Sequence, residues 1–121
     1  MAMLTVVGYY EHYNHHYEKD PVMAQRSSAL RTRRMANLGE NLRSWRKVQR
    51  LTAAMVAERA GINRTTLRAI EEGSGAVKME NLFAVLEVLG IDDAVTAATD
   101  PANDERGRVL LADGLPDRVR P

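Results

Sequence analysis

Residues 51–73, LTAAMVAERAGINRTTLRAIEEG, constrain the fold more than any other part of the chain. The pattern predicts two short helices, over residues 53–60 and 64–72, joined by a tight turn. Thr52 and Asn63 stand where each helix needs a side-chain oxygen to accept hydrogen bonds from its free backbone amides. This stretch therefore has both the start signals and the spacing of two packed helices.

The predicted helix pair has one apolar side and one polar side. Apolar residues recur at helical spacing, at Val56, Ala60, Leu67 and Ile70. A glycine follows each of the two predicted helices, at Gly61 and Gly73. Glycine tolerates the left-handed backbone conformation that ends many helices. The outward side of the second helix carries hydrogen-bonding side chains, those of Arg64, Thr65, Thr66 and Arg68. Such side chains can bind base edges and phosphates of DNA.

The charge of the chain is unevenly distributed, although its net value is only +1. Residues 37–78 hold eight Lys/Arg and four Glu, whereas residues 79–100 hold five acids and no base. Positive charge thus gathers around the predicted helix pair, as phosphate binding requires. An ordinary solvated helix surface could show the same imbalance. Charge alone therefore does not distinguish such a surface from one that binds phosphate.

Several classes of protein and site are not expected. The chain of 121 residues allows one modest core, and the lack of cysteine excludes disulfides and thiolate metal sites. No apolar run is long enough to span a bilayer, and the N-terminus lacks a basic region followed by an apolar one, so we expect a cytoplasmic protein with no membrane partner. His12 and His16 have metal-ligand spacing, but their tyrosine-rich flanks argue against a helix and no further ligand is firmly placed. We expect no metal, no cofactor, no catalytic residues and no enzymatic activity.

Residues 1–36 differ in composition from the rest. Residues 5–9 favour a strand, but one strand alone is not stable. Pro21 is expected to end that piece, and residues 25–34 are basic, with too little apolar content for a core element. Three interpretations remain open: an arm that adds phosphate contacts, a strand added to a partner, or an extension upstream of a natural start at Met35. We expect a flexible N-terminal extension that the fold does not need.

The remaining pattern is helical. A first helix is predicted over residues 37–50, with Trp45 as a core anchor on the same side as Leu38, Leu42 and Val48. A fourth is predicted over residues 78–89, with an apolar stripe at Met79, Leu82, Val85, Leu86 and Leu89. Asp92 can cap a short fifth helix. The chain is therefore predicted to be all-α, with one domain over residues 37–99 and a C-terminal tail over residues 100–121 as a partner or dimer contact.

Four segments between residues 38 and 95 agree in order with a known family: LGENLRSWR, LT, VAERAGINRTTLRAIEEG and ENLFAVLEVLGI. They resemble the helix-turn-helix domain of lambda-repressor/Cro-type regulators, the XRE family. The resemblance implies a compact five-helix bundle whose third helix enters the major groove of double-stranded DNA. It also implies a homodimer that reads a palindromic operator, and so a sequence-specific transcriptional repressor.

Carried over by position, the resemblance assigns roles to individual residues. Base contacts are expected from Arg64, Thr65, Thr66 and Arg68, because guanidinium groups can bind guanine O6 and N7 in pairs of hydrogen bonds. Phosphate contacts are expected from Arg43, Thr52, Asn63 and Lys78. Arg46 and Glu71 match a structural ion pair that ties the first helix to the third.

Two departures from the family pattern qualify this assignment. Relatives often carry glutamine at the first turn of the second helix, where this chain has Ala53. The loop before the fourth helix has Val77 and Lys78 instead of Pro-Ser. The alternative reading is therefore a protein-interaction module that has lost specific DNA binding.

The tail resembles a narrower group. DPANDERGRVLLADGLPDRVRP is similar to the tails of HipB-like antitoxins. This similarity implies an antitoxin that represses its own operon and binds a HipA-like kinase toxin.

Overall fold

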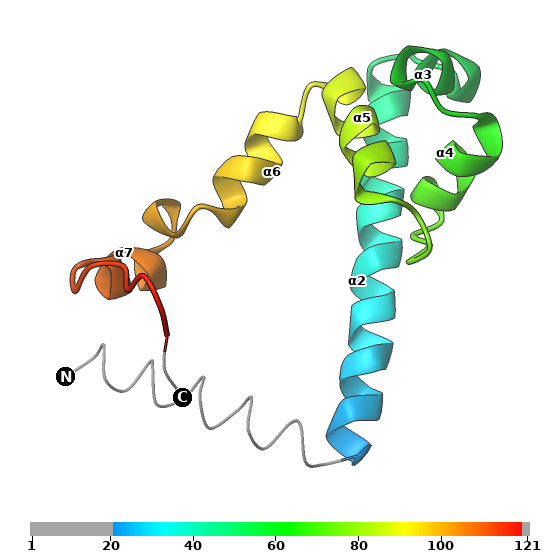
Figure 1. Cartoon of the computed structure of the whole chain (residues 1–121). Helices are drawn as coiled ribbons and strands as arrows, with labels where there is room; N and C mark the ends of the chain where they lie inside the picture. Colours follow the sequence, from blue (N-terminus) through cyan, green and yellow to red (C-terminus); the bar gives the residue numbers. More distant parts are fainter. Residues whose placement is uncertain (1–20, 120–121) are drawn as a thin grey trace. The chain divides into compact units, whose positions relative to one another are not determined.

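The computed structural model describes residues 21–119, and over these residues it contains helices and no strand (Figure 1). The described residues form two units, one spanning Val22–Asp93 and the other taking in the residues from Ala94 onward. The elements in chain order are α2 (Pro21–Val48), α3 (Ala53–Ala60), α4 (Arg64–Glu71), α5 (Met79–Leu89), α6 (Asp92–Thr99), the 3-10 helix η1 (Pro101–Asn103) and α7 (Glu105–Leu111). The all-α prediction agrees with this architecture. Residues 5–9, whose composition favours a strand, and the two histidines lie outside the described residues.

The predicted start of the first helix at residue 37 is wrong, because α2 begins at Pro21 and runs for 28 residues. Residues 21–36 are rich in Ala, Arg, Gln, Leu and Met, which favour helix, and proline is well tolerated in the first helical turn. Their low apolar content correctly indicated little burial, since only Gly39 and Leu42 of α2 are buried. A segment can be helical without burying one of its faces, whereas the prediction had taken low apolar content as evidence against a helix.

The two helices at the centre of the pattern form as predicted. Thr52 is the N-cap of α3, and its hydroxyl oxygen accepts from the Met55 backbone N–H at 3.1 Å. Asn63 is the N-cap of α4, and its side-chain oxygen accepts from the Thr66 backbone N–H at 2.7 Å. Lys78 occupies the N-cap position of α5 without a side-chain hydrogen bond, because a lysine ammonium group cannot accept one from the backbone amides.

The core of the Val22–Asp93 unit lies where α3, α4 and α5 gather around the C-terminal half of α2 (Figure 1). Its buried apolar side chains come from these four helices: Leu42, Val56, Ala57, Leu67, Ile70, Val85, Leu86 and Leu89. Helix α6 buries none of its residues. The predicted five-helix bundle is therefore wrong in its count, because six α-helices occur among the described residues and α6 does not contribute to the core.

Three expected core residues of α2 are not buried, and Val48 is the most exposed of them at 75%. Trp45 is 46% exposed and Leu38 is 41% exposed. The stripe of α2 that packs against its neighbours runs instead through Gly39, Leu42 and Arg46, at spacings of three and four residues. Trp45 lies beside this stripe, so its size and apolarity did not decide its burial.

Close backbone approach joins α2 to the end of α4. A Cβ atom on Gly39 would lie 2.6 Å from the carbonyl oxygen of Ile70 and would also meet that of Glu71. A Cβ atom on Gly73, which has a φ of 78°, would lie 2.5 Å from the carbonyl oxygen of Met35. These two glycines let α2 cross the C-terminal end of α4 at a distance that no larger residue would permit.

The second unit is held by local hydrogen bonds. The Asp100 carboxylate accepts from the Ala102 backbone N–H at 2.9 Å and caps η1, and Asp104 caps α7 through the Arg106 backbone N–H at 2.8 Å. The Asn103 side-chain amide donates to the carbonyl oxygen of Ala97 at 3.0 Å. No residue of η1 or α7 is buried, so this unit has no apolar core within the described part of the chain.

Candidate nucleic-acid interface

Helix α4 presents a polar face to solvent because its apolar residues all lie on the opposite side. Leu67 and Ile70 are buried at a spacing of three residues. Arg64, Thr65 and Arg68 are exposed. The side chains of α4 that were predicted to contact the DNA major groove are therefore accessible to solvent.

A hollow of about 660 Å³ lies between α4, the C-terminal part of α2 and the start of α3. Its cationic lining comes from Arg43 and Arg46 of α2 and from Arg64 and Arg68 of α4. Glu71 and Glu72 line the hollow as well, so four arginines outnumber two carboxylates and the packing of α2 on α4 gives the hollow a net positive lining. We call this surface the α4 groove.

The predicted contact residues divide into two groups. Three predicted base contacts, Arg64, Thr65 and Arg68, line the α4 groove together with the predicted phosphate contact Arg43. Thr66, Thr52, Asn63 and Lys78 do not line it. Thr52 and Asn63 already use a side-chain oxygen as a cap, but a hydroxyl and an amide each retain a proton to donate.

Arg46 and Glu71 form the ion pair that the resemblance implies. Arg46 Nε donates to Glu71 Oε1 at 2.7 Å, and Arg46 Nη2 donates to Glu71 Oε2 at 3.4 Å. Arg46 Nη1 donates to the carbonyl oxygen of Leu51 at 3.1 Å. The two side chains are 13% and 10% exposed. One guanidinium therefore joins α2, the α2–α3 connection and α4, and fixes the angle at which α4 is presented.

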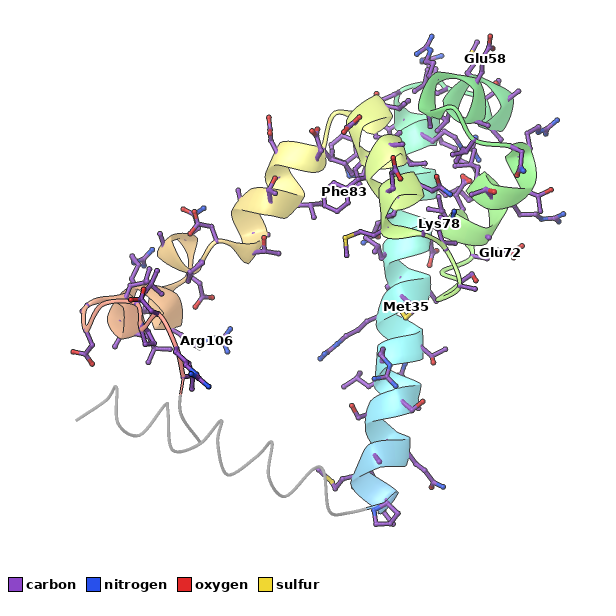
Figure 2. The ribbon with its side chains drawn as sticks, in the orientation of Figure 1. Met35, Glu58, Glu72, Lys78, Phe83 and Arg106 are labelled. Atoms are coloured by element: carbon purple, nitrogen blue, oxygen red, sulfur yellow. The ribbon has the colours of Figure 1, made fainter. Side chains whose placement is uncertain are left out.

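A second Arg–Glu pair lies on the outer face of α4. Arg68 Nε lies 3.3 Å from Glu72 Oε1, and the two side chains are 81% and 68% exposed. Figure 2 labels Glu72 where α4 ends. A pair this exposed is weak, so Arg68 can leave it for a base at little cost. The sequence reasoning missed Glu72 as a groove residue, although its spacing of four from Arg68 is a readable signal.

Ala53 forms part of the groove wall together with Leu67. A methyl group therefore occupies the place where relatives are expected to have a polar amide. The groove keeps its cationic rim but lacks a neutral hydrogen-bond donor at the first turn of α3.

Two other kinds of feature are absent from the described part of the chain. No group of three or more His, Cys, Asp or Glu residues there could hold a metal ion. No helix in residues 21–119 is long and apolar enough to cross a membrane.

Comparison with protein families matches residues 37–99 to a helix-turn-helix domain of the XRE/Cro-like type. Comparisons with curated proteins and with solved structures give no match. The matched span covers just over half of the chain and contains α3, α4 and every residue that lines the α4 groove. The chain therefore belongs to the helix-turn-helix family of DNA-binding regulators.

Proposed function

We propose that the protein is a sequence-specific repressor that reads a palindromic operator as a homodimer, with α4 in the major groove. The observation that supports this most strongly is the outward face of α4, where Arg64, Thr65 and Arg68 border a groove that also contains Arg43. Bidentate arginine contacts provide base discrimination of about 1–3 kcal/mol each. The positively charged side chains around the groove can bind backbone phosphates and so fix the position of the protein on the duplex.

The proposal assigns different roles to two arginines of the same groove. Arg68→Ala should relax the preference at one base position, because a base contact carries sequence information. Arg43→Ala should weaken binding to all sequences about equally and reduce the salt slope by about one, because a lost phosphate contact releases one counterion fewer. Arg59→Ala, a change of equal charge at an exposed residue outside the α4 groove, serves as the matched control.

The experiment selects bound sequences from random DNA and then measures affinity by fluorescence anisotropy over a range of salt concentrations. Enrichment of a two-fold symmetric site is the expected result. Equal affinity for selected and random duplexes would refute sequence-specific binding.

We further propose that the protein is an antitoxin that represses its own operon and binds a HipA-like kinase toxin. The similarity of residues 100–121 to HipB-like tails supports this, and the exposure of Leu115 and Val119, each 79%, provides apolar contact area. Co-purification with a kinase encoded by the adjacent reading frame tests it. Failure of such a kinase to bind the intact chain would contradict the toxin partner and would leave the DNA proposal unaffected.

The alternative function is a protein-interaction module without specific DNA binding, and Ala53 is the observation that favours it. Both alternatives describe a binding protein and not an enzyme. The DNA selection separates them, since an interaction module should show weak affinity that does not depend on sequence.

A further inference from the structure

The N-terminal half of α2 carries a second hollow that shares no residue with the α4 groove. It is about 410 Å³ in volume and is lined by Ser27, Leu30, Arg31, Arg34, Met35 and Leu38. Leu30 and Leu38 are each 41% exposed. This helix face is therefore partly apolar and accessible.

The hollow continues into an apolar pocket of about 230 Å³. Met35 and Leu38 line both (Met35 is labelled in Figure 2), and Val77, Met79 and Leu82 form the far wall. Met79 is 73% exposed, although it stands in the apolar stripe of α5. We call the two hollows together the α2 groove. Its apolar end is large enough for a branched aliphatic side chain.

The other end of the α2 groove is positively charged. Residues 21–39 contain four arginines and no acidic residue. Neither Arg31 nor Arg34 forms an ion pair with another residue in the described ranges. The chemistry that fits this groove is an apolar side chain flanked by carboxylates.

The tail after α7 has that chemistry. Leu115 is 79% exposed and stands between Asp113 and Asp117, two residues away on each side. Helix α7 ends at the turn in which the Gly114 backbone N–H donates to the carbonyl oxygen of Leu111 at 2.9 Å. Pro116 favours an extended backbone at Leu115, which suits a peptide lying along a helix face.

We propose that the α2 groove binds residues 112–119 of a second copy of this chain, with Leu115 in the apolar pocket and the two aspartates beside Arg31 and Arg34. Exchange of tails in both directions gives a two-fold symmetric contact, in which each copy supplies one groove and one tail. Direct pairing of two α2 helices is disfavoured, because arginines on both would face each other. This inference rests on the proposed reading of a palindrome, which requires a dimer.

Charge reversal on the two sides provides the test. One variant carries Arg31→Glu and Arg34→Glu, and the other carries Asp113→Lys and Asp117→Lys, both in the full chain. Each alone should weaken its homodimer at least about tenfold in sedimentation equilibrium, because every contact then joins like charges. Mixed together, the two variants should form a heterodimer of nearly wild-type affinity, because both contacts again join opposite charges.

A control variant, Arg26→Glu with Arg33→Glu, makes the same charge change on α2 outside the groove and should leave the dimer intact. Circular dichroism checks that each variant is folded. A monomeric wild-type chain, or reversal variants that dimerise as well as the control, would overturn the inference. Failure of the mixture to associate would also overturn it, since that result would mean that the tail does not bind a second copy.

Binding to a single operator half-site separates this inference from the proposed function. The reversal variants should retain half-site preference if the α4 groove reads DNA, even where they no longer dimerise. A wild-type chain that exchanges tails but shows no preference among DNA sequences would refute the repressor and leave the dimer contact standing.

Discussion

The ion pair between Arg46 and Glu71 offers the sharpest test of how α4 is held. Glu71→Ala would leave the guanidinium, only 13% exposed as a side chain, with one remaining hydrogen bond to the carbonyl oxygen of Leu51. Breaking a buried pair on one side costs about 3–5 kcal/mol, and the remaining bond and residual exposure favour the lower end. We therefore expect a loss of about 3 kcal/mol in the free energy of unfolding.

The assay is urea unfolding followed by circular dichroism, with the wild-type slope as a check on two-state behaviour. Glu72→Ala is the matched control, because it removes the partner of Arg68 from a pair that is 81% and 68% exposed and should cost no more than about 0.5 kcal/mol. The double variant Arg46→Met with Glu71→Leu should be more stable than Glu71→Ala, since apolar residues of similar volume leave no unpaired charge. Equal small losses for Glu71→Ala and Glu72→Ala would refute the reasoning.

Three further substitutions test individual contacts. Gly39→Ala should destabilise the fold by about 1–2 kcal/mol in the same unfolding assay, because the new Cβ would meet the carbonyl oxygens of α4 and the gain in helix propensity is smaller than that clash; an unchanged stability would show that the two helices can separate freely. Arg50→Gly should stabilise by about 0.5–1 kcal/mol, because Arg50 has a φ of 59° at the end of α2; a loss of stability there would point to a role for the side chain. Ala53→Gln should strengthen DNA binding by about 1 kcal/mol without changing the salt slope, because an amide adds a hydrogen bond and no charge; anisotropy over a range of salt measures both quantities.

Local features of the fold were readable from the sequence. The N-caps Thr52 and Asn63, the apolar spacing of Leu67 and Ile70, and the outward position of Arg64 and Arg68 all follow from interactions within a few residues. Because the residues that make such interactions are close together in the sequence, the two central helices and the exposed face of α4 were predictable without a structure.

Other features depended on which segments meet. Periodicity placed Leu42 on the packed side of α2, but it could not show that Gly39, and not Trp45, shares that side. Sequence reasoning also took weak apolar content before residue 37 as evidence against a helix, whereas the structure has a helix there with little burial.

The amino-acid sequence by itself determined which short segments are helical and which side of α4 carries arginine, because caps and periodicity act over a few residues. Only the tertiary structure brought Arg43 of α2 to the same groove as Arg64 and Arg68 of α4. That juxtaposition depends on the close crossing of α2 and α4 at Gly39 and on the Arg46–Glu71 pair, which join residues more than twenty positions apart. Burial and long-range contact are properties of the packed helices together, and no single segment contains them.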